Sequence, residues 1–213
     1  YDCELAMLVP NKQGVDRAKK IGVENFNVFF SPSENFNMSN HGKVSSQIFT
    51  EYCAALEGVP KDKVRVYLSC MFGCPYSGGI HHERMETALR WAESLGDTIV
   101  LADTIGNADP TLIRSAVDMT RSLGIKSNLA LHLHHGRRKN RMFDNLSTAF
   151  DLGIREFDSS IGGMGGCPFV PGSGGNLATE DLVKWGNEEG LNCGVSPEDL
   201  GMLSEYVEKT LKH

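Results

Sequence analysis

Residues 128–135 have the sequence NLALHLHH, an alternation of apolar and polar side chains that ends in histidines. As a β-strand, this stretch puts Ala130, His132 and His134 on one face, because successive side chains of a strand point to opposite sides. Polar or reactive residues also stand at the ends of other candidate strands. They are Asp103, Asp158 and, in the loop after the last strand, Cys167. Barrels of the (β/α)8 type carry their active sites at this end of their strands. The stretch therefore favours a barrel of the TIM type.

The rest of the chain alternates short strand-like runs with amphipathic segments. We expect strands at 3–9, 26–30, 64–70, 98–103, 128–134 and 156–160. Apolar residues recur with helical spacing in the intervals, for example over 85–95 and 112–123. Ser196 and Pro197 predict the start of a last helix that runs to about residue 211. This order is typical of parallel α/β folds.

A doubly wound parallel sheet is the main alternative to the barrel. Such a sheet binds nucleotides through a G-x-G-x-x-G turn after a strand, and none follows the first four candidate strands. We therefore expect residues 1–213 to form a single TIM-barrel-type catalytic domain with only about six of eight βα units. Because the chain opens at Tyr1 within a candidate strand, we expect this domain to be incomplete at its N-terminal side.

Composition limits the classes of partner. The 213 residues carry a net charge of −6 with a pI near 5.6, which argues against nucleic-acid binding. No apolar run approaches the length of a membrane span, and no secretion signal is recognisable. Six scattered cysteines favour a reducing compartment, the cytoplasm or the mitochondrial matrix, over a disulfide framework. Cys70 and Cys74 match no common zinc spacing, so we expect buried or loop thiols there.

Several polar residues each allow a functional and a structural interpretation. His132 and His134 have the spacing of a metal chelate, but either could be a hydrogen-bonded core histidine. Asp103 stands where barrel enzymes place catalytic carboxylates, and it could equally shape the following loop. Asn176 precedes a helical segment, so it is either the N-cap or a metal ligand.

The stretch GGMGGCPFVPGSGGN, residues 162–176, surrounds the single thiol of Cys167 with seven glycines. It is either an active-site loop whose glycines allow close approach and movement, or a flexible hairpin with an incidental thiol. Before it, Arg137, Arg138 and Lys139 begin a basic segment. These side chains could bind the phosphates of a substrate or simply be solvated.

Motifs in the same order resemble those of hydroxymethylglutaryl-CoA lyases, members of the metal-dependent lyase and condensing-enzyme barrels. The resemblance runs from about residue 7 to residue 185 and rests on LSCMFGCPYSG, DTIGNADP, HLH and the glycine-rich stretch with its asparagine. It implies His132, His134 and Asn176 as ligands of a divalent cation, Mg²⁺ or Mn²⁺, with Cys167 catalytic and Asp103 in the active site.

The resemblance also implies an acyl-CoA thioester substrate and cleavage of its acyl chain to acetyl-CoA and a 3-oxo acid such as acetoacetate. Two departures are visible. The Arg–Asp pair of the family's first strand has no counterpart here, and a longer basic segment follows the histidines. A Claisen-type condensing enzyme and a barrel that binds acyl-CoA or metal without turnover therefore stay as alternatives. The oligomeric state, a homodimer or a larger homo-oligomer among the options, is left open.

Overall fold

The computed structural model describes residues 3–136, 141–166 and 174–211. Their centre is one parallel sheet with strands in sequence order. The strands are β1 (Ala6–Leu8), β2 (Asn25–Phe30), β3 (Val64–Leu68), β4 (Thr98–Ala102), β5 (Asn128–His132) and β6 (Glu156–Asp158). Every neighbouring pair is parallel. All six strands expected from the sequence are therefore present.

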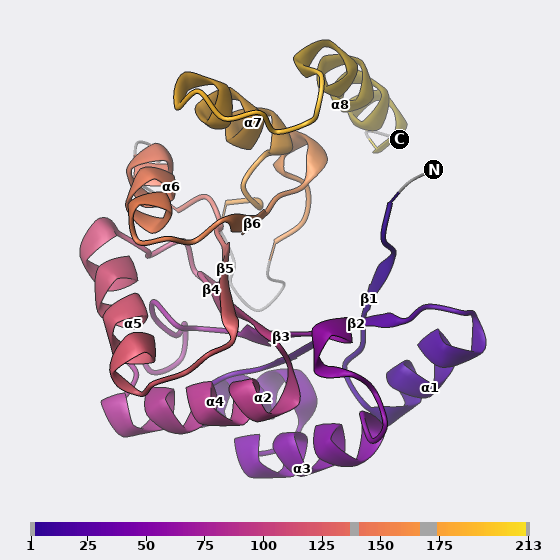
Figure 1. The fold of residues 1–213 in the computed structure, drawn as a ribbon, viewed down its shortest axis with the longest axis vertical. Coiled ribbons are helices and arrows are strands. Elements are labelled where there is room, and N and C mark those ends of the chain that lie inside the picture. Colours follow the sequence, from indigo (N-terminus) through magenta and orange to yellow (C-terminus); the bar gives the residue numbers. More distant parts are fainter. Residues whose placement is uncertain (1–2, 137–140, 167–173, 212–213) are drawn as a thin grey trace.

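Helices connect the strands, and most of them cover the convex side of the sheet, as Figure 1 shows. They are α1 (Lys12–Lys20), α2 (Glu34–His41), α3 (Ser45–Ala55), α4 (His82–Leu95), α5 (Pro110–Ser122), α6 (Met142–Asp151), α7 (Thr179–Glu188) and α8 (Pro197–Leu211). Short 3₁₀ turns, η1 (Lys61–Lys63) and η3 (Ile161–Gly163), complete the described elements. Strands inside and helices outside give the architecture of a (β/α)8 barrel with six of its strands, which confirms the expected fold class.

The hydrophobic core lies between the sheet and these helices. Side chains such as Val66, Leu101 and Leu131 leave the convex face of the strands and pack with Leu89 and Ile113 of α4 and α5. All five are at most 1% exposed. Because this layer holds the strands in a curved sheet, it also fixes the position of every strand end.

Local signals account for several of the helix ends. Gly124, Gly153 and Gly190 adopt positive φ angles directly after α5, α6 and α7, a conformation that glycine reaches without strain. Ser196 accepts a hydrogen bond from the backbone N–H of Asp199, so it caps α8 as expected. The 64–70 strand ends early, at Leu68, because Cys70 has a φ of 64° that no strand accommodates.

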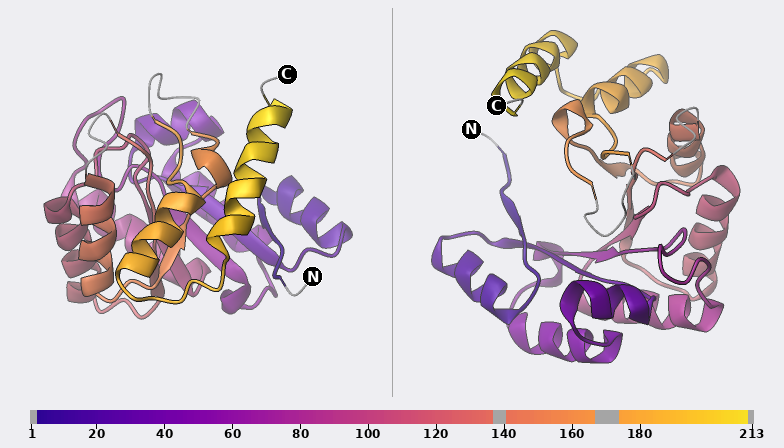
Figure 2. Two further views of the ribbon diagram at one scale, coloured as in Figure 1. Left: turned by 90° about the horizontal axis from the view of Figure 1, so that it is seen from above. Right: turned by 180° about the vertical axis from the view of Figure 1, so that it is seen from behind.

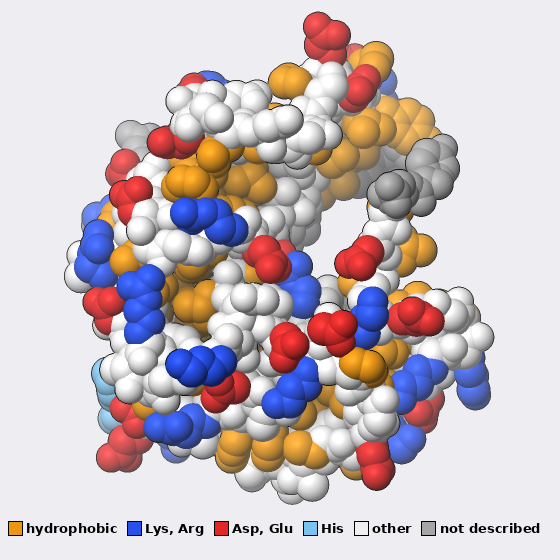
Figure 3. Space-filling model, viewed as in Figure 1, with side chains coloured by type: hydrophobic (Ala, Val, Ile, Leu, Met, Phe, Trp, Pro, Cys, Tyr) orange, Lys and Arg blue, Asp and Glu red, His pale blue; other side chains and the backbone are white. Residues whose placement is uncertain are grey.

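The concave side of the sheet is open to solvent. Figure 2 shows the sheet as an incomplete ring, and Figure 3 shows a hollow that opens between β1 and α8. Exposed apolar residues stand on both sides of this opening, Leu5 and Leu8 beside Met202 and Tyr206. None of the helices in the described part of the chain combines the length and apolar composition that crossing a membrane requires.

Candidate active site

A cavity of about 800 Å³ occupies the concave side, at the carboxyl ends of the strands. Its walls include His132 and His134 from β5 and the residues that follow it, together with Asp158 of β6 and Asn176. Parallel strands bring these positions to one edge of the sheet, although they are up to 44 residues apart in sequence. The strand ends therefore form the polar part of a single pocket.

The two histidines of the HLH motif meet in this pocket. Nε2 of His132 lies 3.1 Å from Nε2 of His134. On the other side of each ring, Nδ1 of His132 is 3.2 Å from a carboxylate oxygen of Asp158, and Nδ1 of His134 is 3.1 Å from the carbonyl oxygen of Thr104. Each ring is thus held from behind, and its second nitrogen faces the other ring.

The partners of the Nδ1 atoms determine where the ring protons lie. A carbonyl oxygen can only accept, so Nδ1 of His134 carries its hydrogen and donates to Thr104. The carboxylate of Asp158 likewise receives the Nδ1 hydrogen of His132. In the neutral rings both Nε2 atoms then present lone pairs to one another. Burial lowers the pKa of His134, and nearby His132 lowers it further, which favours the neutral form that binds metals.

Asn176 supplies a third potential metal ligand beside this pair. Its backbone forms an antiparallel β-bridge with His134, and the N–H of Leu177 donates to the carbonyl of Leu133 at 2.9 Å. The side-chain Nδ2 donates to the carbonyl of Met164 at 2.6 Å, which fixes the orientation of the amide. Its Oδ1 is buried and accepts no hydrogen bond of ordinary geometry from the described residues, although the amide lies close enough to the His134 ring to raise the pKa of that histidine. Because α7 begins at Thr179 with Ala178 as N-cap, Asn176 is not the helix cap.

Two imidazole nitrogens and one amide oxygen make a donor set suited to a divalent cation. Among the described residues, no three His, Cys, Asp or Glu side chains are grouped for a metal, so the amide is needed to complete the set. An acceptor that is buried without a partner is costly unless something binds to it. The orphaned Oδ1 and the opposed lone pairs therefore fit a cation.

The glycine-rich stretch lets two backbone segments lie against one another around Asn176. A Cβ at Gly163 or Gly165 would meet the backbone oxygen or the side-chain nitrogen of Asn176, and a Cβ at Gly175 would overlap the carbonyl of Gly163. Close packing of the segments that carry the asparagine is thus one use of these glycines. Cys167 of the same stretch lies outside the described residues.

The basic residues that were expected to bind substrate, Arg137, Arg138 and Lys139, also lie outside the described residues. The start of their loop, at Gly136, belongs to the described residues. Gly136 approaches Gly106 of the loop after β4 so closely that a Cβ on either residue would overlap the backbone of the other. The loops after β4 and β5 are therefore in direct contact.

Asp103 has the loop-forming arrangement that the sequence left as one of two possibilities. It is 2% exposed, and its carboxylate accepts hydrogen bonds from the backbone N–H groups of Asn107 at 2.8 Å and Ala108 at 3.0 Å. Burial raises the pKa of Asp103 to about 6, although these N–H groups act in the opposite direction. The residue shapes the loop whose Thr104 carbonyl holds His134. Proton transfer by Asp103 stays a prediction.

The sequence analysis missed the groups that surround Asp158. Arg65 of β3 donates from Nη2 to Asp158 Oδ1 at 3.0 Å, and the hydroxyl of Tyr67 also bonds to this carboxylate. Burial alone would raise the pKa of Asp158, but the hydrogen bond from His132 and the charge of Arg65 lower it below the ordinary value. An arginine at an inward position of a predicted strand was the signal that could have revealed this cluster.

Comparison with known proteins decides the family. The model of the family described as HMGL-like matches residues 4–207. The chain belongs to the HMGL-like family. Hydroxymethylglutaryl-CoA lyase YngG of Bacillus subtilis is 34% identical over 97% of this HMGL-like chain and 69% of its own length. (R)-citramalyl-CoA lyase of Chloroflexus aurantiacus is 33% identical over 96% of this chain and 65% of its own. Two acyl-CoA lyases thus resemble the chain almost equally.

Solved structures agree with the HMGL-like assignment. An HMG-CoA lyase from Acinetobacter baumannii, in complex with coenzyme A and 3-methylmalate, superposes with a TM-score of 0.89 at 31% identity. That match covers 100% of this chain and 70% of the other. The HMG-CoA lyase from Brucella melitensis gives a TM-score of 0.88 at 28% identity, with 98% and 74% covered. The HMGL-like chain therefore spans about two thirds to three quarters of the relatives described here.

Proposed function

We propose that this HMGL-like chain carries the metal site of a carbon–carbon lyase that acts on a 3-hydroxyacyl-CoA. 3-Hydroxy-3-methylglutaryl-CoA is the leading substrate, with acetyl-CoA and acetoacetate as products. The observation that carries the proposal is the 3.1 Å distance between His132 Nε2 and His134 Nε2 in a cavity that Asn176 also lines, with its buried Oδ1 left without a hydrogen bond of ordinary geometry among the described residues. The names of the similar lyases support the same class of reaction.

His132, His134 and Asn176 would hold the divalent cation, Mg²⁺ or Mn²⁺. When bound there, such an ion supplies Lewis-acid chemistry that lowers the pKa of a substrate hydroxyl and orients it. Asp158 and the Thr104 carbonyl keep the two Nε2 atoms free by occupying both Nδ1 hydrogens. The protein thus holds both rings in the tautomer that binding through Nε2 needs.

Cleavage of the bond next to the 3-hydroxyl requires two proton transfers. The hydroxyl loses its proton as the bond between C2 and C3 breaks, and the electron pair of that bond moves into a thioester enolate. C2 of the enolate then takes a proton to give acetyl-CoA. We assign this second transfer to the thiol of Cys167 and the first to Asp103, directly or through a relay. The carboxylate of Asp103 is bonded to the N–H groups of Asn107 and Ala108 and is not among the described groups that line the cavity, which favours transfer through a relay. A pKa of about 6 leaves it largely ionised at neutral pH.

Apolar side chains form a second part of the open cavity. Leu8, Phe29, Phe36 and Phe157 line it beside the polar groups. These walls are suited to the methyl and methylene groups of a branched acyl chain. We further propose that residues 1–213 belong to one barrel domain, whose strand ends form the site.

The test is product analysis with the 213-residue chain and added Mn²⁺. Incubation with 3-hydroxy-3-methylglutaryl-CoA should give acetyl-CoA and acetoacetate in equal amounts. Citramalyl-CoA is the second candidate substrate, since a citramalyl-CoA lyase is as similar as the hydroxymethylglutaryl-CoA lyases, and its cleavage would give pyruvate instead.

Other outcomes of this assay contradict the proposal. Net formation of a longer acyl chain from acetyl-CoA and a 2-oxo acid would identify a condensing enzyme. Binding of Mn²⁺ and an acyl-CoA without products would identify a barrel that binds but does not turn over. Failure to bind Mn²⁺ would remove the metal site on which the proposed function rests.

A further inference from the structure

Asp158 is the centre of a hydrogen-bond cluster on the concave face. Its two oxygens have different partners: Oδ1 accepts from Arg65 Nη2 at 3.0 Å, and Oδ2 lies 3.2 Å from Nδ1 of His132. The Tyr67 hydroxyl contacts the same carboxylate. The Asp158 side chain is 18% exposed, so solvent cannot easily replace these partners. The partners of Oδ1 therefore determine whether Oδ2 points at His132.

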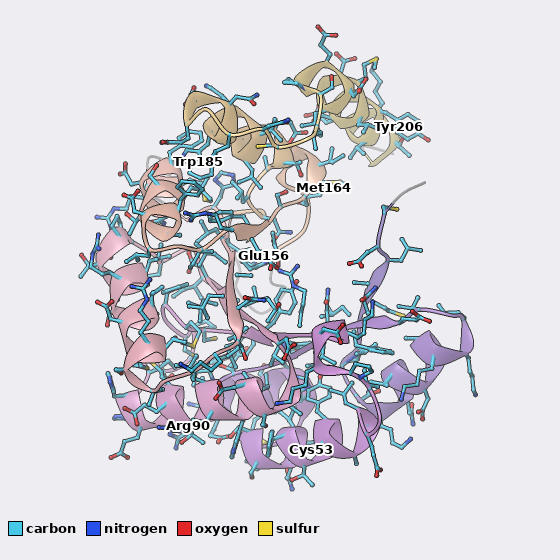
Figure 4. The ribbon with its side chains drawn as sticks, viewed as in Figure 1. Cys53, Arg90, Glu156, Met164, Trp185 and Tyr206 are labelled. Atoms are coloured by element: carbon cyan, nitrogen blue, oxygen red, sulfur yellow. The ribbon has the colours of Figure 1, made fainter. Side chains whose placement is uncertain are left out.

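Arg65 reaches Asp158 across the concave face of the sheet. It belongs to β3, and two strands, β4 and β5, separate it from β6. Its guanidinium also lies 3.6 Å from a carboxylate oxygen of Glu156 and 5.9 Å from the centre of the Tyr67 ring. Figure 4 shows Glu156 on the inner side of the curved sheet. One arginine therefore links β3 to two carboxylates of β6.

A carboxylate with fewer partners rotates more easily about its Cβ–Cγ bond. The Tyr67 hydroxyl and Arg65 both oppose this rotation, and Arg65 does so with a charge-assisted hydrogen bond to Oδ1, which leaves Oδ2 directed at His132. With Oδ2 in place, the His132 hydrogen stays on Nδ1 and the Nε2 lone pair faces the cavity. Outer partners of this kind orient metal-binding histidines in other proteins and raise their basicity.

We propose that Arg65 is a positioning residue that acts on the metal site through Asp158. Within the described part of the chain, Arg65 makes no hydrogen-bond contact with the proposed ligands His132, His134 and Asn176. It sets the tautomer and orientation of His132 by fixing the carboxylate of Asp158. The effect of Arg65 on metal affinity rests on the proposed function. Its effect on the tautomer of His132 does not depend on a bound metal.

The test uses Arg65→Met, Arg65→Lys, Asp158→Asn and the double variant Arg65→Met/Asp158→Asn. Arg90→Met is the matched control, because Arg90 is exposed on α4 at the outer surface of the molecule. Thermal unfolding identifies variants that fail to fold. If Arg65→Met is one of them, Arg65→Lys carries the test, since lysine keeps the charge but cannot hold two carboxylates in a fixed fork.

Two measurements report the role of Arg65. Long-range ¹⁵N NMR of the metal-free protein should show His132 protonated on Nδ1 in the wild type, and a mixture of tautomers in Arg65→Met. Titration with Mn²⁺, followed by electron paramagnetic resonance, should show binding weakened about tenfold in Asp158→Asn and severalfold in Arg65→Met. Arg65→Lys should fall between Arg65→Met and the wild type, and Arg90→Met should match the wild type.

The double variant separates positioning from a general structural effect. If Arg65 acts through Asp158, its removal should change Mn²⁺ affinity no further once Asp158 is Asn. Additive losses would overturn the proposal, and so would a folded Arg65→Met with wild-type tautomer and affinity. A wild type that does not bind Mn²⁺ would instead contradict the proposed function, while the tautomer measurement would still decide the role of Arg65.

Discussion

Nε2 of His132 and Nε2 of His134 lie 3.1 Å apart, and the opposite nitrogen of each ring is already bonded to an acceptor. Two neutral imidazoles held in this way direct lone pairs at each other, which is unfavourable unless a cation lies near both. A metal ion or a proton between the two rings would relieve this repulsion. Asn176 Oδ1, buried without a hydrogen bond of ordinary geometry among the described residues, would likewise be stabilised by a cation.

Mn²⁺ should stabilise the protein, and Asn176→Ala should remove most of that effect. A ligand that binds only the folded state at about 100 times its Kd adds about 2.7 kcal/mol to the free energy of unfolding. Urea unfolding with Mn²⁺ and with EDTA measures the difference. Asn187→Ala, at an exposed position of α7, is the control and should keep the wild-type response. Equal responses of both variants would exclude Asn176 as a ligand.

Cys167→Ala should lose turnover and keep substrate binding. Loss of a general acid costs about 10²- to 10⁴-fold in rate, whereas removal of one small side chain leaves most acyl-CoA contacts intact. Steady-state kinetics and equilibrium binding of a substrate analogue measure the two effects. Cys53→Ala changes a thiol on the outer face of α3 and should behave as wild type. Unchanged turnover in Cys167→Ala would refute the assigned role.

His41 should make the protein less stable in mild acid. Burial lowers the pKa of His41, and the charge of Lys43 lowers it further, so the folded state takes up a proton on this ring less readily than the unfolded chain does. The unfolded chain takes up the proton below the ordinary value near 6.5, and stability is therefore lost as the pH falls below it. Urea unfolding at pH 7.5 and pH 5.5 should show a smaller loss for His41→Phe than for the wild type.

The control for this pH effect is His82→Phe. His82 is largely exposed at the start of α4, its side chain at 69%. Its replacement should leave the loss between pH 7.5 and pH 5.5 unchanged. The interpretation fails if His41→Phe and the wild type lose the same free energy over this interval.

Gly106→Ala should destabilise the protein more than Gly124→Ala. Both glycines have positive φ angles, 66° and 70°, so each substitution carries about 1–2 kcal/mol of backbone strain. Only at Gly106 would the added Cβ meet another chain segment, the backbone at Gly136. The difference between the two free energies of unfolding isolates that contact. Equal costs would show that the two loops separate freely.

Native thiol reactivity should divide the cysteines by exposure. In Cys167→Ala, a disulfide reagent at pH 8 should react quickly with three thiols, those of Cys3, Cys53 and Cys193. Cys70 and Cys74 are buried, and burial raises the pKa of Cys70 to about 12, so it should react only on unfolding. Five fast thiols in the folded protein would contradict this arrangement.

The sequence was sufficient for the order of strands and helices, since each depends on local periodicity. The candidate ligands were also identifiable, as they stand at strand ends. The Arg65–Asp158 pair was not predictable, because 93 residues separate the two and only the curvature of the sheet brings them together. The position of Asn176 likewise depends on backbone pairing with His134, a long-range contact that capping patterns do not reveal.

Contact between Gly106 and Gly136 has a practical consequence for redesign of the specificity of this barrel. If only one of the two loops were replaced by that of another enzyme, a side chain at position 106 or 136 would clash with the backbone of the other loop. Successful grafts should therefore transplant both loops as a matched set, with their two glycines retained.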